Sequence, residues 1–134
     1  WEVKAKSRRV PHTKMGWEIN ADSFYNIIKQ FASNPKVKEL VITENGAAFN
    51  DKLINGAIED NDRIAYFKLY LKAMLKAKNE GVKITGYMAW TLMDNFEWAE
   101  GYEARFGLVY NDFKTQQRTI KKSGYWWQQF LNGH

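Results

Sequence analysis

Glu44 is the residue whose position points most directly to chemistry. It follows the β-branched segment 40–43 and precedes the turn-forming pair Asn45-Gly46. In a parallel α/β sheet the carboxyl ends of the strands hold the functional site, so a carboxylate there lies in a partly desolvated cleft on a rigid element. Glu44 is therefore a candidate functional carboxylate. The alternative is an exposed loop residue before a turn.

A second group of candidates lies in an aromatic and acidic stretch between Gly86 and Phe106. Its aromatic residues are Tyr87, Trp90, Phe96, Trp98, Tyr102 and Phe106, and its acidic residues are Asp94, Glu97, Glu100 and Glu103, against the basic Arg105. A sugar ring has apolar C–H faces and a rim of hydroxyl groups, so aromatic faces beside carboxylates suit a sugar. An aromatic core would use the same residues, because large rings bury much area at low entropy cost.

Three residues of this stretch are candidates for contact with a ligand. Trp90 ends an apolar segment and could form the floor of a pocket. Glu97 and Trp98 could bind hydroxyl groups through carboxylate oxygens and the indole N–H. The alternative interpretation packs Trp90 beneath the loops and pairs Glu97 with Arg105.

Length and composition describe a globular protein. The 134 residues fit one ordinary domain, and 45% hydrophobic and 26% charged residues are typical of globular chains. Cysteine is absent, which excludes a disulfide framework, a thiolate nucleophile and a zinc–thiolate site. No apolar run approaches the roughly 18 residues of a membrane-spanning helix. No secretory signal is visible, so we expect a cytoplasmic protein.

The charge pattern predicts a solvated surface. The formal net charge is +5, and the excess is divided between residues 1–16 and 114–122. A basic chain invites a nucleic-acid interpretation, which would require binding that weakens steeply with salt. Because the excess is modest and split between two ends, we expect neither nucleic acid nor a membrane as a partner.

Apolar spacing and local end signals predict alternating helices and strands. The expected helices cover 20–33, a segment from Asp60 or Asn61 to a C′ glycine at Gly81, and 119–131. The expected strands cover 39–43, 82–90 and 108–110.

This alternation predicts βαβ units on a parallel sheet. The two strong strands are apolar enough to be buried on both faces, so they need neighbours that this chain does not supply. A (β/α)8 barrel needs about 250 residues, and two of its eight units would take about this length. We therefore expect part of a larger domain.

Several motifs together resemble the family 1 glycoside hydrolases, the β-glucosidase family. The segment 43–46 (Thr-Glu-Asn-Gly) resembles the nucleophile motif, and 86–102 resembles the last barrel strand with its sugar-binding loop. Three further segments resemble the family in the same order, namely Met15-Gly16-Trp17-Glu18-Ile19, residues 105–110 and residues 118–123. The likeness runs over residues 13–131.

The resemblance implies an α/β fold, a (β/α)8 TIM barrel of which this chain supplies the last two or so βα units. Residues 1–16 would be a connecting segment and residues 17–134 the two units with the terminal helix. The implied reaction is retaining hydrolysis of β-glycosidic bonds, of the cellobiose or aryl β-glucoside type, with Glu44 as nucleophile and a covalent glycosyl-enzyme. No cofactor or metal is implied.

The resemblance also implies a subsite for the non-reducing sugar. Trp90 would border the sugar, Glu97 would accept hydrogen bonds from its outer hydroxyls, and Trp98 would donate one. Phe106 would line the same subsite. A carboxylate at position 97 would repel a phosphate, so a plain glycoside is expected rather than a phosphosugar.

The general acid of the family is not found in this sequence. In the family it lies in an Asn-Glu-Pro motif, whereas Asn79-Glu80 is followed here by Gly81. We therefore expect the isolated chain to be incomplete and inactive, with the N-terminal part of the barrel as its partner, in the same protein or on a complementary chain. The alternative is a non-catalytic carbohydrate-binding fragment.

Overall fold

The computed structural model describes residues 10–133. Along the chain these residues form α1 (Ala21–Ala32), β1 (Leu40–Asn45), α2 (Asn61–Asn79), β2 (Ile84–Ala89), the short 3-10 helix η1 (Trp98–Glu100), β3 (Val109–Asn111), β4 (Arg118–Ile120) and α3 (Lys122–Leu131).

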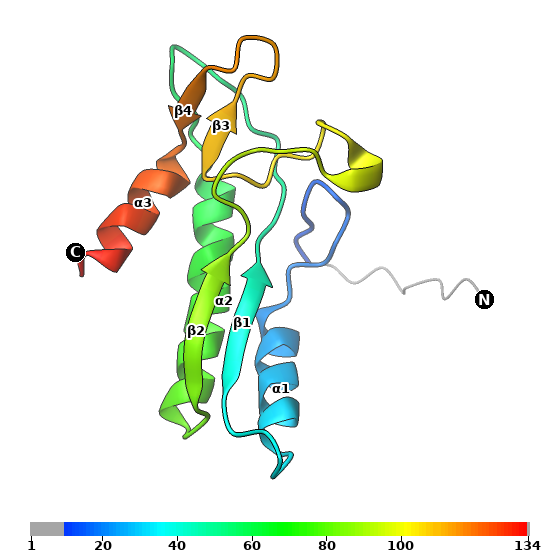
Figure 1. The fold of residues 1–134 in the computed structure, drawn as a ribbon, viewed down its shortest axis with the longest axis vertical. Coiled ribbons are helices and arrows are strands. Elements are labelled where there is room, and N and C mark those ends of the chain that lie inside the picture. Colours follow the sequence, from blue (N-terminus) through cyan, green and yellow to red (C-terminus); the bar gives the residue numbers. More distant parts are fainter. Residues whose placement is uncertain (1–9, 134) are drawn as a thin grey trace.

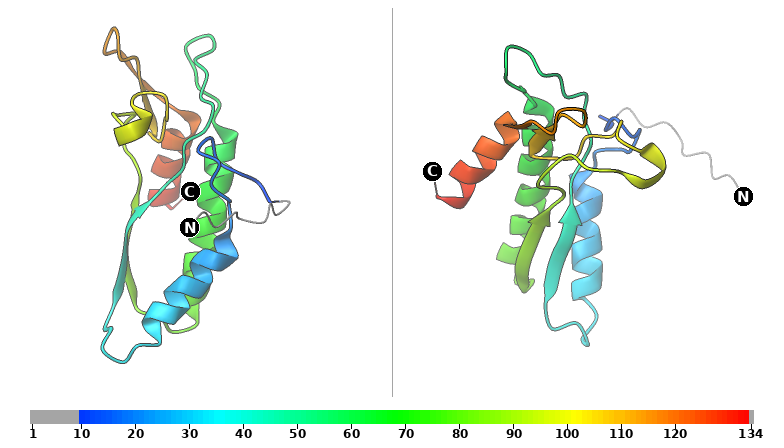
Figure 2. Two further views of the ribbon diagram at one scale, coloured as in Figure 1. Left: turned by 90° about the vertical axis from the view of Figure 1, so that its right-hand side faces the viewer. Right: turned by 45° about the horizontal axis from the view of Figure 1, so that its top comes forward.

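The centre of the fold is a β1–α2–β2 unit. β1 and β2 pair in parallel, with Leu40 opposite Ile84 and Asn45 opposite Ala89. The helices lie together on one side of this sheet, and the loops that follow β1 and β2 gather at the carboxyl ends of the strands (Figures 1 and 2). The parallel βαβ arrangement expected from the sequence is confirmed.

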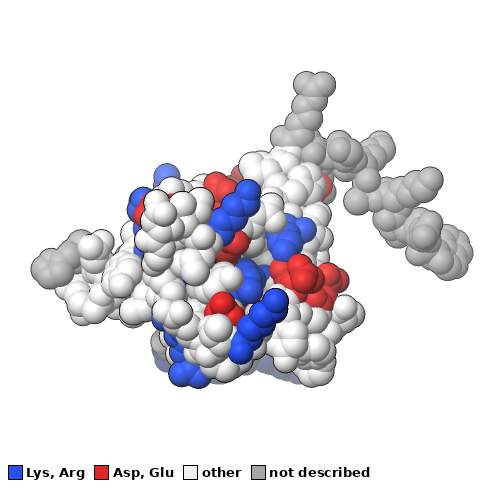
Figure 3. Space-filling model, turned by 90° about the horizontal axis from the view of Figure 1, so that it is seen from above, with Lys and Arg blue, Asp and Glu red and all other residues white. Residues whose placement is uncertain are grey.

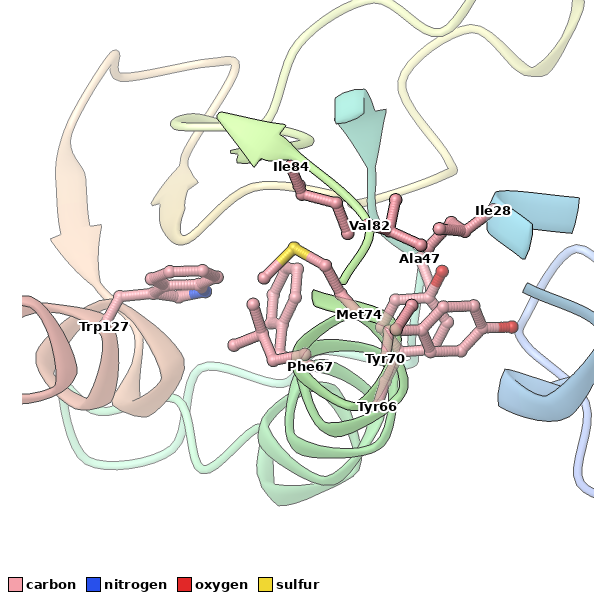
Figure 4. Close-up of a cluster of buried hydrophobic side chains, with 11 residues drawn as sticks. Ile28, Ala47, Tyr66, Phe67, Tyr70, Met74, Val82, Ile84 and Trp127 are labelled. Carbon is pink, nitrogen blue, oxygen red and sulfur yellow. The ribbon is translucent and has the colours of Figure 1, made fainter. Parts of the chain in front are cut away.

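The hydrophobic core lies between the sheet and the helices (Figure 4). Phe67 of α2 is fully buried, and its ring lies 5.2 Å from that of Trp127 in α3 at an interplanar angle of 77°. Tyr66 and Tyr70 stack at 4.2 Å on the same helix. Edge-to-face and offset ring pairs contribute about 0.5–1.5 kcal/mol each beyond the area they bury. The aromatic residues of α2 and α3 therefore hold both helices to the sheet.

The other face of the sheet is uncovered. Val41 in β1 is 43% exposed and Met88 in β2 is 56% exposed. The described helices cover one side of the sheet only (Figure 2). This agrees with the expectation that the two strands need neighbours that this chain does not supply.

Local end signals explain where the helices begin and end. The Asn20 side chain caps α1 by accepting a hydrogen bond from the Ser23 backbone N–H at 3.0 Å. Asp60 occupies the N-cap position of α2, but its carboxylate binds Arg63 and Ser123 instead of capping. Gly81 follows α2 with φ +94°, as expected of a C′ glycine.

The C-terminal region corrects one expectation. The terminal helix begins at Lys122 and not at residue 119. Thr119 and Ile120 belong to β4, which pairs antiparallel with β3 so that Ile120 lies opposite Val109. Both residues are β-branched and therefore favour an extended backbone. The polar turn between the two strands contains Gln116 with φ +62°.

Within residues 10–133, every helix is too short or too polar to cross a bilayer.

Candidate active site

Glu44 lies at the carboxyl end of β1 with its side chain exposed. Its neighbour Asn45 anchors this strand end to the core. The Tyr87 hydroxyl donates to Asn45 Oδ1 at 2.6 Å, and Asn45 Nδ2 donates to the Tyr66 hydroxyl at 3.2 Å. Burial raises the pKa of Tyr66 and of Tyr87 well above that of a free phenol, so both hydroxyls stay protonated. The backbone that carries Glu44 is thus fixed on one side by the buried Tyr66 and the partly buried Tyr87.

The ends of β1 and β2 lie in direct contact. The Trp90 backbone N–H donates to the Asn45 carbonyl at 2.8 Å. A Cβ placed on Gly46 would lie 1.7 Å from the Trp90 carbonyl oxygen, so no larger residue fits there without a shift of the backbone. The peptide bond between Trp90 and Thr91 is cis. This close approach brings Trp90 beside the strand end that carries Glu44.

Trp90 also holds Glu97. The indole Nε1–H of Trp90 donates to Glu97 Oε1 at 3.3 Å. Burial raises the pKa of Glu97, the Trp90 hydrogen bond opposes this effect, and the negative charges of Glu44 and Asp94 raise it further. Glu97 therefore lies on the loop that faces the strand end carrying Glu44, and its pKa responds to that neighbouring charge.

The alternative pairing of Glu97 with Arg105 is wrong. Arg105 Nη1 instead donates to Asp94 Oδ2 at 2.7 Å, and its guanidinium lies 4.1 Å from the ring centroid of Tyr110. Glu97 instead has the indole of Trp90 and the side chain of Asn95 as its hydrogen-bond partners.

Trp98 projects from the loop after β2. Its side chain is 85% exposed, and its φ of +49° is unusual for a residue other than glycine. Such conformations cost about 1–3 kcal/mol and cluster at ligand-binding loops. The turn is closed by the Glu97 backbone N–H, which donates to the Gly101 carbonyl at 2.7 Å.

Phe106 lies beneath the loops. It is only 5% exposed and packs in a small cluster with Ala48 and Ala104, against which Trp90 also packs. The ring of Trp17, which is itself exposed, lies 6.0 Å from that of Phe106. Phe106 therefore supports the loop end from below, and Trp17 is a further aromatic neighbour that residue type and spacing did not mark as a candidate.

The structure thus brings Glu44, Trp90 and Glu97 together, places Phe106 under them and leaves Trp98 projecting outward.

A cavity of about 900 Å³ lies elsewhere, between residues 11–14 and the start of α2. None of these five candidates is among the described residues that line it. Of the five candidates, Glu44 and Trp98 are exposed, Trp90 and Glu97 are partly buried, and Phe106 is buried. Among the described residues, no three His, Cys, Asp or Glu side chains are grouped so that they could hold a metal ion.

Seen from the loop end, Lys and Arg side chains are interspersed with Asp and Glu side chains (Figure 3). A mixed surface of this kind is typical of a solvated face.

Functional side chains at the carboxyl ends of parallel strands, with helices on the outside, are the organisation of an α/β-barrel enzyme.

Comparison with known proteins defines the family. The model of glycosyl hydrolase family 1 matches residues 2–134. The chain is 45% identical to β-glucosidase A of Thermotoga maritima over 134 residues, which are 99% of this chain and 30% of that protein. It is 41% identical to a 6-phospho-β-galactosidase of Clostridium acetobutylicum over 126 residues, which are 93% of this chain and 27% of that protein. The chain therefore belongs to glycosyl hydrolase family 1.

The solved structures agree with the sequence matches. The family 1 β-glucosidase of Thermotoga maritima superposes with a TM-score of 0.92 at 46% identity, over 95% of this chain and 29% of that one. Family 1 β-glucosidases are (β/α)8 TIM barrels, so this chain has the fold of a barrel segment. It spans about 30% of the length of the relatives that it matches.

Proposed function

We propose that the protein to which this chain contributes hydrolyses β-glycosides with retention of configuration, and that Glu44 is its nucleophile. The observation that carries the proposal is the strand-end carboxylate of Glu44 beside the hydrogen-bonded pair of Trp90 and Glu97. The family membership supports it, because the matched relatives include β-glucosidases.

In the proposed reaction Glu44 attacks the anomeric carbon, and the bond to the leaving-group oxygen breaks as that oxygen takes up a proton. Water then hydrolyses the resulting glycosyl ester. Retention requires a second carboxyl group about 5–5.5 Å from the first. No Asn-Glu-Pro motif occurs in the 134 residues, so we place the proton donor on a part of the barrel outside this sequence.

The sugar would be bound by the loop after β2. Trp90 borders the ring, Glu97 accepts hydrogen bonds from the outer hydroxyls and Trp98 donates one, while Phe106 supports the subsite from below. The T. maritima β-glucosidase has been solved with deoxynojirimycin and with glucoimidazole. For this chain a plain β-glucoside is favoured over a phosphosugar, because a phosphate would meet the negative charge of Glu97.

A chimeric barrel provides the test. We call it the barrel chimera: T. maritima β-glucosidase A in which the 134-residue chain replaces the segment that it matches. We expect the barrel chimera to hydrolyse aryl β-glucosides. We expect its Glu44→Gly variant to lose turnover by several orders of magnitude while it still binds deoxynojirimycin.

Azide identifies the role of the carboxylate that is removed. If Glu44 is the nucleophile, azide attacks from the vacated face of the sugar, so an activated aryl β-glucoside should give the α-glycosyl azide. A β-glycosyl azide would assign Glu44 as the acid/base instead. Near-parental activity of the Glu44→Gly variant would overturn the mechanism.

A second candidate function is sugar binding without catalysis. The outward-projecting Trp98 and the absence of the acid motif from this sequence favour it for the chain alone. Calorimetric titration of the isolated chain with cellobiose distinguishes the two functions. Saturable binding that Trp98→Ala abolishes, together with an inactive barrel chimera, would favour the binding role.

A further inference from the structure

A cluster of buried charged side chains lies beneath the candidate site. It consists of the carboxylates of Asp51, Asp60 and Asp94 and the cationic groups of Arg63 and Lys121. Each of these side chains is at most 1% exposed. A buried charge is costly unless it is paired and hydrogen-bonded, so removing one partner from this buried ion cluster leaves another charge uncompensated.

Asp94 is the member of the cluster that belongs to the loop after β2. Its Oδ1 accepts hydrogen bonds from Lys121 Nζ at 2.7 Å and from the Gly107 backbone N–H at 2.9 Å. Its Oδ2 accepts from Arg105 Nη1 at 2.7 Å. Both oxygens are therefore engaged, and the partners come from both the far end of the same loop and the start of α3.

The bond between Asp94 and Arg105 closes the base of a loop. The loop of residues 94–105 begins and ends at this ion pair, and it carries Glu97 and Trp98. Arg105 is fixed in turn by two rings, with its guanidinium carbon 4.1 Å from the Tyr110 centroid and 4.9 Å from that of Phe113. Glu97 thus lies three residues from a fully buried anchor.

Lys121 connects this anchor to the segment that follows Glu44. Its Nζ donates to Asp94 at 2.7 Å and to Asp51 Oδ2 at 2.5 Å. Asp51 lies seven residues after Glu44 and is held by two bonds from Arg63, at 3.0 and 2.8 Å. The segment after β1 and the loop after β2 are therefore joined through the ammonium group of Lys121. They are joined a second time through Arg63, whose Nη2 also donates to the Arg105 carbonyl at 2.7 Å.

We propose that Asp94 is a positioning residue for the sugar subsite. Its bonds to Arg105 and Gly107 hold the base of the 94–105 loop closed, and through Lys121 they set the place of Glu97 relative to Glu44. This proposal rests on the function proposed above, because it concerns the same subsite.

Asp60 provides a matched control within the same cluster. It is equally buried, but its carboxylate binds Arg63 and Ser123, which belong to α2 and α3 and not to the 94–105 loop. A variant of Asp60 therefore removes a buried charge of the same kind but leaves every bond of Asp94 in place. It reaches the loop only through Arg63, which still donates to Asp51 at 2.8 Å and to the Arg105 carbonyl at 2.7 Å.

The experiment compares Asp94→Asn with Asp60→Asn in the barrel chimera. We expect both variants to lower the melting temperature. Asp94→Asn should lower kcat/KM for an aryl β-glucoside roughly 10- to 100-fold, chiefly through KM, since a displacement of about 1 Å can cost that much. Asp60→Asn should stay within about threefold of the parent.

A double-mutant cycle with Glu97→Gln separates positioning from general stability. If Asp94 acts through Glu97, the double variant should lose less kcat/KM than the product of the two single losses, because part of the loss is shared between them. Arg105→Gln repeats the cycle at a side chain that is 19% exposed and can be rehydrated, should Asp94→Asn not fold. Additive losses in kcat/KM, or parental kinetics of the Asp94 and Arg105 variants, would overturn the proposal.

The two proposals fail in different ways. If the barrel chimera neither hydrolyses aryl β-glucosides nor binds deoxynojirimycin, the proposed function falls, and the positioning role falls with it. If the barrel chimera is active and depends on Glu44, but the effects of Asp94 and Glu97 are additive, only the positioning role is wrong.

Discussion

The contact between Gly46 and Trp90 yields a sharp expectation for the Gly46→Ala variant of the barrel chimera. The added Cβ would lie 1.7 Å from the Trp90 carbonyl oxygen and 2.7 Å from its carbonyl carbon. Real Cβ contacts essentially never fall below 3.0 Å, so these atoms must separate by at least 3.0 − 1.7 = 1.3 Å. Both contacts are with the backbone, which cannot swing aside as a flexible side chain does.

We expect the displacement of the two backbones to lower the activity through Trp90. Moving the two backbones apart weakens the 2.8 Å bond from the Trp90 N–H to the Asn45 carbonyl, and it displaces the indole that binds Glu97. A displacement of about 1 Å at positioning residues can lower the rate about 100-fold. We expect kcat/KM of Gly46→Ala for an aryl β-glucoside to fall by at least that order of magnitude.

Gly81→Ala is the matched control. Gly81 has φ +94° and no atom within 4 Å of an added Cβ, and it lies after α2, at the opposite end of β2 from Trp90. The left-handed conformation should cost about 1–2 kcal/mol of stability while kcat/KM stays parental. Steady-state kinetics and urea unfolding of both variants measure the two effects. Parental kcat/KM for Gly46→Ala would refute the placement of Trp90 against the end of β1.

Three further results are expected. Glu97→Ala in the barrel chimera should lower kcat/KM for β-glucosides roughly 10- to 150-fold, the cost of losing a hydrogen bond to a charged acceptor; kinetics within about twofold would leave Glu97 outside the subsite. The pKa of Glu97 is raised chiefly by burial, so the stability that its protonated carboxyl contributes is present below the unfolded-state pKa and is lost as the pH rises through the folded-state pKa. The melting temperature of Glu97→Gln should therefore rise relative to that of the parent over this pH interval. A difference in melting temperature that does not change with pH would contradict this sign. Asn45→Leu leaves the Tyr87 hydroxyl without its acceptor and should reduce the unfolding free energy by about 1–3 kcal/mol in urea titrations, whereas an unchanged midpoint would show that the bond contributes nothing.

The main elements were predictable because their signals are local. Apolar spacing and local end signals predicted a helix over 20–33, and the structure has α1 at Ala21–Ala32. The strand ending near Glu44 and the C′ glycine at position 81 were found in the same way. Each of these signals lies within a few residues of the boundary that it marks.

The hairpin near the C-terminus was not predictable by the same reasoning. Helical spacing in the terminal segment extends back to Thr119, so a helix from that residue fits the sequence alone. What makes residues 119 and 120 a strand is their pairing with Tyr110 and Val109, about ten residues earlier. Tertiary pairing therefore overrides a local helical pattern here.

The partner of Arg105 was beyond sequence reasoning for a related reason. Asp94 and Glu97 are both acidic residues of the same loop, eleven and eight residues before Arg105. Only the folded loop shows that Gly107 and Lys121 place Asp94 at its base, where the arginine meets it. The strand-end rule and the family resemblance could select Glu44, Trp90 and Glu97, but not the ion pair that supports them.

The open face of the sheet explains what this chain can contribute to catalysis and what it needs from elsewhere. Glu44 is fixed from behind by Asn45 and its two tyrosines, so its position is determined within the chain. Its carboxylate is nevertheless exposed, and water weakens every charge interaction that a transition state could use. Electrostatic stabilisation in an active site requires that water be excluded and that dipoles be fixed in advance. The side of the sheet that carries Val41 and Met88 has no such cover in the described residues. On the mechanism proposed above, these two βα units supply the geometry, and we expect the low-dielectric wall and the proton donor to come from whatever closes that face.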